Sequence, residues 1–495
     1  MLGIFSGKSD HPLADAREAR RTLADLVGRE PAAALDEVSA WLESLSAADD
    51  LKLDLRFELV CQLGDAAASH ARRLARDYLT APRLGRAHEF RLWLANRNYW
   101  GQVCHAFERC LGQYEERGKG ADAIRAALPR LCARLLNAYA ALLKWDQFRY
   151  GPIDVRHWAA AGRAYLAADR QKLAKERIAL YAGGADSSAE AEYLKALVFS
   201  AASMDSMLPL EIEVAERLIA HFLPYFVLTA EARPDHIYWV DAGKAQPPTR
   251  LAKLPEISPT LRFFNTGKAV DAVQELLARV RQSGEVPGDI NLGGQYSTRI
   301  VLPVLEHLAA HWAPKPPTRS HVRHNVKSRL TVIAGLPAIC GRLGASGGDA
   351  DLGEAWIAED VSLGGMGAVV PLGSNDWIRI GCLVGTQPEG GDNWLVGVIR
   401  RFHRETATQG SVGIETISKA PRAMACDSNG LSADGILLDA PGAAGSTVRV
   451  ALPLAAWEDR FPLAAAIDGR QRHLQPMGMI ETGVDFVIGR FRLAD

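Results

Sequence analysis

Apolar residues repeat at helical spacing through the first part of the chain, from residue 1 to about residue 225. One such run, just after a first-turn proline, consists of Leu35, Val38, Leu42 and Leu45. Steps of three or four residues place side chains on one face of an α-helix. The stretches AIRAALPRLCARLLNAYAALLKW and LPLEIEVAERLIAHFLPYFVL are also apolar on a broad face. Because no fixed repeat period stands out, the pattern predicts a helical bundle or an irregular α-solenoid.

The pattern changes near residue 232. HIYWVDAGKAQPPTRL and TLRFFNTG are rich in aromatic and β-branched residues, with prolines between them, which is typical of short strands. We therefore expect a small β-containing insert at about residues 232–266. Helical spacing returns in AVDAVQELLARVRQ and STRIVLPVLEHLAAHW and ends at APKPP, where prolines stop a helix and stiffen a linker. This predicts a mainly α-helical region over residues 1–313.

From Arg319 onwards, short apolar runs alternate with glycine-rich or polar turns. The runs are SRLTVIAGLPAI, EAWIAEDVSLGGMGAVV, DWIRIGCLVGTQ, NWLVGVIRRF and SVGIETI. Strands at this spacing favour a small antiparallel β-barrel, which we place at residues 314–420. The β character continues in STVRVALPLAAW and GVDFVIGRFRL, so residues 421–495 are predicted to be a β-rich extension that enlarges the barrel or forms a second one. The expected fold class is multidomain α+β.

Composition and charge narrow the function classes. Charged residues make up 23% of the chain, and the formal net charge is -1, so no strong field attracts nucleic acid or an acidic membrane. The chain has no uncharged apolar run long enough to predict a membrane span, and the first residues do not resemble a secretory signal peptide. The seven cysteines have no regular spacing, which argues against a disulfide framework. Cys104, His105 and Cys110 lack a second ligand pair for zinc, so buried free thiols in a cytoplasmic protein are expected.

Catalytic motifs are weak throughout the chain. GIFSGKS resembles a phosphate-binding loop, but its first glycine is one residue too close to the Gly-Lys-Ser, and no strand precedes it. The stretch GGDADL has only a passing likeness to a cyclase motif, and no phosphodiesterase motif is present. No pair of carboxylates has a spacing that singles it out. We therefore expect a protein that is not an enzyme, with no metal and no cofactor.

Two short patterns place side chains of particular chemistry close together in the sequence. RSHVR places Arg319 and Arg323 four residues apart, just after the proline linker. The simpler interpretation of this stretch is a basic linker exposed to solvent. Guanidinium groups offer paired donors to phosphate oxygens and to the guanine edge, and they stack on flat rings. Asp360, Ser362 and Gly365 fit D-x-S-x-x-G, although glycines within a strand can also mark only a bulge or a turn. A carboxylate accepts hydrogen bonds from N1–H and N2–H₂ of guanine, and glycines admit a flat ligand close to the backbone.

Taken together, in this order and strand context, the two patterns resemble the PilZ domain family, the bacterial receptors for cyclic di-GMP. The resemblance covers about residues 317–420: RSHVR, the strand RLTVIAGL, then DVSLGG, followed by RIGCLVGTQ, WLVGVIRRF and SVGIETI. The gap between the two motifs is longer than usual for the family, and GRLGASGGDADLGE is the expected loop that absorbs it. For the helical N-terminal region we identify no family.

The resemblance implies roles for particular residues. Arg319 and Arg323 would clamp the phosphates and guanine faces, and without ligand we expect them to have no fixed partner. Asp360 would read the guanine edge, with Ser362 nearby. Close approach of the ligand would depend on Gly364 and Gly365. Weaker candidates, chosen by proximity alone, are His321, His324 and Arg329.

The resemblance also implies a function. The protein would bind cyclic di-GMP and relay this second messenger to an unidentified protein partner through the helical region, in motility, pilus or biofilm control. The alternative is a scaffold with a degenerate PilZ barrel that binds proteins without nucleotide. The two differ in whether the arginines face Asp360 and Ser362 across an open surface of the barrel.

Overall fold

The computed structural model divides into two compact units. The helical unit comprises residues 1–149, 153–204 and 208–317, and the barrel unit comprises residues 150–152, 205–207 and 318–495. The chain thus passes from one unit to the other close to the proline linker. The structure describes residues 9–80, 85–265, 268–315, 321–344, 353–373, 377–428, 430–443, 445–467 and 470–494.

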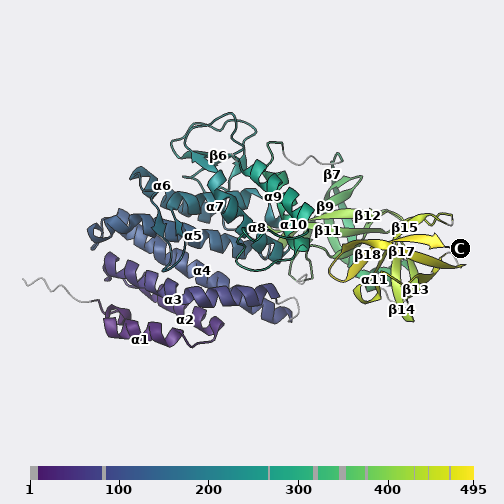
Figure 1. Ribbon diagram of the computed structural model, residues 1–495, viewed down its shortest axis with the longest axis horizontal. Helices are drawn as coiled ribbons and strands as arrows, with labels where there is room; N and C mark the ends of the chain where they lie inside the picture. Colours follow the sequence, from purple (N-terminus) through teal and green to yellow (C-terminus); the bar gives the residue numbers. More distant parts are fainter. Residues whose placement is uncertain are drawn as a thin grey trace, which may run out of the picture. The chain divides into compact units, whose positions relative to one another are not determined.

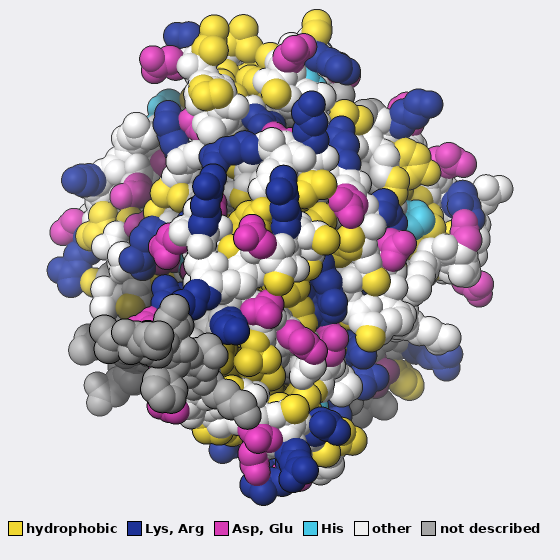
Figure 2. All heavy atoms as spheres, turned by 90° about the vertical axis from the view of Figure 1, so that its left-hand side faces the viewer, with side chains coloured by type: hydrophobic (Ala, Val, Ile, Leu, Met, Phe, Trp, Pro, Cys, Tyr) yellow, Lys and Arg dark blue, Asp and Glu magenta, His cyan; other side chains and the backbone are white. Residues whose placement is uncertain are grey.

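The helical unit is built from amphipathic helices around the buried helix α5 (Figure 1). Its α-helices are α1 (Ala16–Leu26), α2 (Pro31–Ala47), α3 (Leu53–Thr80), α4 (Arg86–Glu115), α5 (Leu128–Gln147), α6 (Arg156–Arg170), α7 (Ala189–Ala201), α8 (Pro209–Phe222), α9 (Ala269–Ser283) and α10 (Thr298–Trp312). The apolar run of α2 is buried, as its spacing predicts, and the Glu30 carboxylate caps this helix by accepting from Ala32 N and Ala33 N. α5 packs against α4, α6 and α7. Figure 2 shows Lys and Arg intermixed with Asp and Glu on one face, consistent with the near-zero net charge.

A small sheet interrupts the helices. Its strands are β3 (Val227–Thr229), β4 (Tyr238–Asp241), β5 (Thr249–Arg250) and β6 (Leu261–Asn265), in the order β3-β6-β4-β5. The sheet lies where the aromatic and β-branched stretches predict an insert, although its first strand begins at Val227. A further short hairpin pairs β1 (Ile178–Ala179) with β2 (Asp186–Ser187). No pattern in the sequence indicated that hairpin.

The described strands after the linker form two closed antiparallel barrels. The first contains β7 (His324–Ala334), β8 (Glu354–Ser362), β9 (Gly365–Pro371), β10 (Leu383–Pro388), β11 (Leu395–Arg404) and β12 (Gln409–Ser418), in the order β10-β11-β12-β9-β8-β7. The second contains β13 (Arg422–Ser428), β14 (Leu431–Leu437), β15 (Thr447–Pro453), β16 (Leu463–Ile467), β17 (Arg470–Thr482) and β18 (Phe486–Ala494), in the order β13-β14-β15-β18-β17-β16. Alternate residues fill each core, such as Leu330, Val332 and Trp356 in the first and Val448, Val450 and Phe491 in the second. The expected α+β class is confirmed, and the β-rich extension is a second small barrel.

One segment differs from its expected structure. The run SRLTVIAGLPAI was predicted as a strand throughout, but β7 ends at Ala334 and helix α11 (Leu336–Leu343) follows. Gly335 turns the chain with a positive φ of 85°. The carboxylate of Asp485, from the second barrel, then accepts a hydrogen bond from Leu336 N at 3.0 Å. That distant side chain satisfies a backbone donor at the start of the helix.

The two barrels share an apolar interface. Its buried residues come from α11 and from both barrels: Ile333, Leu336, Ile339, Leu383, Val398, Ile436, Phe486 and Ile488. All seven cysteines of the chain are buried and free of disulfides, as expected. Among the described residues, no helix is long and apolar enough to cross a membrane, and no cluster of His, Cys, Asp and Glu is arranged to hold a metal ion.

Candidate functional site

The stretch DVSLGG forms the hairpin between β8 and β9. Ser362 pairs with Gly365, and Leu363 and Gly364 make the two-residue turn. A register shift in β8 sets Asp360 opposite Gly367, whose N–H donates to Oδ1 of Asp360 at 3.1 Å. A Cβ at Gly367 would lie 3.0 Å from Oδ2 of Asp360, so glycine leaves room for the carboxylate. The hairpin therefore holds Asp360 in a fixed position.

Arg323 contacts this carboxylate. Its Nη1 lies 2.7 Å from both Oδ1 and Oδ2 of Asp360, because β7 pairs Asn325 with Asp360. The side chains are 33% and 26% exposed, so the ion pair lies at the surface. The prediction that Arg323 has no fixed partner without ligand is therefore wrong, although Arg323 does face Asp360 as the nucleotide-binding interpretation requires. Arg319, its expected companion, lies outside the described residues.

A cavity of about 230 Å³ opens beside this ion pair on the outside of the first barrel. It is lined by His321, Arg323, Ser362, Gly364, Gly365, Arg400, Arg401, Gly413, Ile414 and Glu415. The structure thus brings together four predicted residues of the two motifs, Arg323, Ser362, Gly364 and Gly365. His321, a weaker candidate, lies beside them. Asp360 does not line the cavity itself, but it contacts Arg323, which does. His324 and Arg329 are exposed in β7, opposite Val361 and Ile357, and do not line the cavity either.

The two motif glycines have different surroundings. A Cβ at Gly365 would lie 2.1 Å from the carbonyl oxygen of Ile414, so this glycine is required by the close pairing of β9 with β12. A Cβ at Gly364 would meet only the His321 ring, at 2.8 Å. The Ser362 hydroxyl donates to Gly365 O at 3.2 Å and keeps its lone pairs for another partner. Of the two glycines, only Gly364 lies against a side chain that a ligand could displace.

Strand β11 supplies two arginines that motif analysis missed. Nε of Arg400 donates to Glu415 at 2.6 Å, and Nη2 donates to Glu481 of β17 at 2.7 Å. Burial lowers the pKa of Arg400, but the hydrogen bonds to Glu481 and Glu415 outweigh it and raise the pKa above its usual value. Arg401 is 52% exposed, and its Nε lies 4.0 Å from Oδ2 of Asp205. The only signal for these residues was the adjacent pair in VIRRF, which reads as part of a strand.

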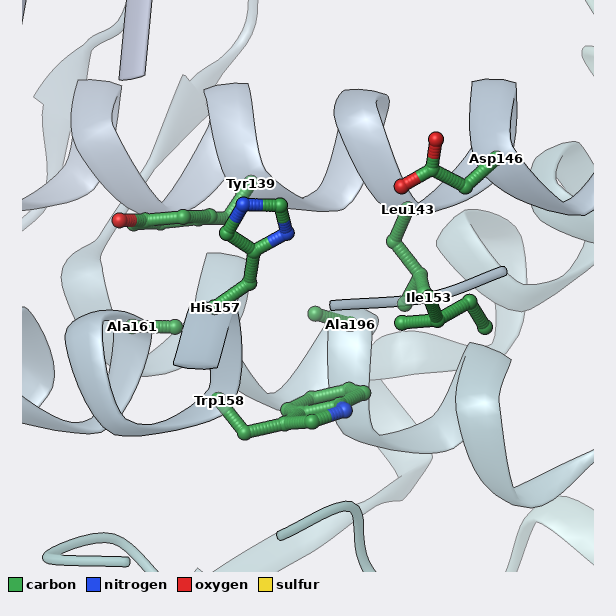
Figure 3. A pocket seen from close by; sticks show the side chains of 8 residues that line it. All are labelled: Tyr139, Leu143, Asp146, Ile153, His157, Trp158, Ala161 and Ala196. Carbon is green, nitrogen blue, oxygen red and sulfur yellow. The ribbon is translucent and has the colours of Figure 1, made fainter. Parts of the chain in front are cut away.

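The helical unit contains a second, smaller cavity, lined by Tyr139, Leu143, Asp146, Ile153, His157, Trp158, Ala161 and Ala196 (Figure 3). Burial raises the pKa of Asp146 to about 6, although Nε of Arg97 donates to this carboxylate at 2.7 Å. Burial also lowers the pKa of His157. The cavity volume is about 20 Å³, close to the space of one water molecule. This cavity is too small for a nucleotide.

The fold and the cavity define a multidomain α+β protein with an arginine-lined cavity on the outside of a β-barrel. Residues 17–234, from α1 to just beyond β3, match a family model described as the N-terminal domain of the cyclic-di-GMP receptor FimW. The match covers less than half of the chain and lies in the helical N-terminal region, where it also spans residues 150–152 and 205–207 of the barrel unit. From its sequence pattern alone, we identified no family for this region. No curated protein matches the chain.

Proposed function

We propose that this protein is a cyclic di-GMP receptor whose nucleotide binds at the cavity of the first barrel. Two separate parts of the chain support this proposal. Residues 17–234 are similar to the N-terminal domain of a cyclic di-GMP receptor, and the motifs RSHVR and DVSLGG resemble those of PilZ domains. The central observation is that Arg323 contacts Asp360 at the edge of a cavity that Ser362, Gly364 and Gly365 also line.

The geometry suggests how binding proceeds. In the ligand-free protein the Asp360 carboxylate is occupied by Arg323 and by Gly367 N–H. The N1–H and N2–H₂ groups of a guanine replace Arg323 at the carboxylate, and the released guanidinium turns to a phosphate or stacks on the base. The resemblance to PilZ domains gives Arg319 the same role. The ligand thus exchanges one charge-assisted contact for several, and no catalytic step is involved.

The proposed receptor also has a downstream role. A cytoplasmic receptor of this kind relays the nucleotide signal to a protein partner through its helical unit, in motility, pilus or biofilm control. A non-binding scaffold is the alternative, in which the Arg323–Asp360 pair is a surface ion pair of the barrel and nothing more. Absence of any nucleotide binding would favour that scaffold.

Calorimetric titration with cyclic di-GMP and cyclic di-AMP tests the proposed site. Adenine lacks the two donors that would hydrogen-bond to Asp360. A bound adenine would cover this carboxylate without pairing it, and a polar group buried without a partner costs about 1–3 kcal/mol, so cyclic di-GMP should bind at least roughly tenfold more tightly. Asp360→Asn should lose most of this preference, whereas Glu359→Gln, a matched change at the exposed neighbouring residue, should keep it. Equal affinity of the wild-type protein for both dinucleotides would contradict guanine recognition.

A further inference from the structure

The charges around the cavity are unequally neutralised. Arg323 is paired with Asp360 at 2.7 Å, and Arg400 is held by Glu415 and Glu481. Among the described residues, the one carboxylate paired with Arg401 is Asp205, at a long 4.0 Å, and the Arg401 side chain is half exposed. Of the three arginines that line the cavity, Arg401 is therefore the one whose donors are least occupied by carboxylates.

A β-bulge explains why Arg401 reaches the cavity at all. Successive residues of a regular strand point to opposite faces, so Arg400 and Arg401 would normally diverge. Here the pairing of β11 with β12 shifts between Ile399 and Arg401, which lie opposite Ile414 and Gly413. Ile399 and Phe402 both point into the barrel core, and both intervening arginines therefore line the outer cavity. Bulges that redirect a side chain are common next to functional sites.

The partner strand leaves space for this arginine. A Cβ at Gly413 would lie 3.3 Å from Cβ of Arg401 and 3.8 Å from its Cγ and Cδ. The aliphatic part of Arg401 therefore crosses the backbone of β12 at a position without a side chain. A guanidinium held in this way presents a planar pair of donors that matches a phosphate group.

We propose that Arg401 is a third arginine of the nucleotide site and binds one phosphodiester group of the ligand. The inference rests on the proposed function and extends it, because neither sequence motif includes β11. Cyclic di-GMP carries two phosphodiester charges. Arg323 immediately precedes β7, whereas Arg401 lies in β11, so the two arginines line the cavity from different segments of the barrel. Arg400, already held by two carboxylates, positions the bulge and does not contact the ligand.

Titration of the full-length protein with cyclic di-GMP tests this role. Arg401→Ala should weaken binding by at least about tenfold, because it removes charge-assisted hydrogen bonds to a phosphate, which are roughly twice as strong as neutral ones. Arg401→Lys should recover part of the affinity, because a lysine keeps the charge but not the paired donors. The loss should shrink as salt concentration rises. Arg492→Ala, a matched change of an exposed arginine in β18, should bind like the wild type.

The outcomes separate this inference from the proposed function. If the wild type binds and Arg401→Ala binds equally well, Arg401 has no role and the receptor function stands. If the wild type does not bind cyclic di-GMP, both the function and the role of Arg401 are wrong. The melting temperature of Arg401→Ala should match that of the wild type, because the side chain is half exposed, and a marked decrease would instead assign Arg401 to the fold.

Discussion

At the residue scale, the candidate site shows how far short motifs can be interpreted. The resemblance to PilZ domains places Arg323 and Asp360 around one ligand, and in the structure the two side chains do face each other. Their mutual neutralisation was not predicted, because which donor occupies a carboxylate depends on the register of β7 against β8. Arg401 was missed for a similar reason, since a bulge leaves no signature in a single strand sequence.

Asp146 should make the stability of the helical unit depend on pH. Its Oδ2 is buried without a hydrogen-bond partner among the described residues, and burial raises the pKa of this carboxyl to about 6. The unfolded chain releases this proton near pH 3.9, about two units lower. Between those values the folded state binds more protons, so this carboxyl makes folding less favourable as pH rises, by up to about 3 kcal/mol.

Urea unfolding of Asp146→Asn at several pH values measures this contribution. The amide imitates the neutral carboxyl, so the wild type should lose stability relative to the variant between about pH 4 and pH 6. Comparison with the wild type at each pH cancels the titration of all other groups. A stability difference that stays constant over this range would show that Asp146 keeps an ordinary pKa in the fold.

At the element scale, hydrophobic patterns predicted most strands and helices, and the failures have local causes. The run LPAI is apolar and short, and such a run does not distinguish a strand from a buried helix. Its helical outcome depends on Gly335 and on Asp485, a residue 149 positions further along the chain. The stretch DVSLGG was predicted to be a strand that contains glycines, and it forms a hairpin. Its two glycines have different surroundings, since Gly365 packs against the backbone of β12 and Gly364 against the His321 ring.

The variants Gly365→Ala and Gly364→Ala should differ in stability. A methyl group at residue 365 has no space against the backbone of β12, so the strands must separate, at a cost of roughly 1–3 kcal/mol. At residue 364 the methyl group meets only the exposed His321 ring, which can move. Thermal unfolding of the two variants checks this difference. Equal melting temperatures would mean that β9 and β12 are not packed as described.

At the scale of the whole molecule, the composition and the position of the proline-rich linker indicated a helical region followed by β structure, and that order is confirmed. The closure of residues 421–495 into its own barrel could not be predicted, because strand number and pairing partners depend on contacts distant in sequence. The contact of Arg400 with Glu481 has the same origin, since it joins the wall of the cavity to the second barrel. The match of residues 17–234 to a receptor's N-terminal domain does not include the residues that line the cavity.

The location of the nucleotide is the central claim, and hydrogen exchange with and without cyclic di-GMP tests it most directly. At short labelling times a saturating ligand slows local opening where it contacts the protein. We predict increased protection around residues 321–323, 360–367 and 399–415, where the cavity lies. Protection confined to the helical region of residues 17–234, with these barrel segments unchanged, would contradict the account and place the nucleotide in the helical unit.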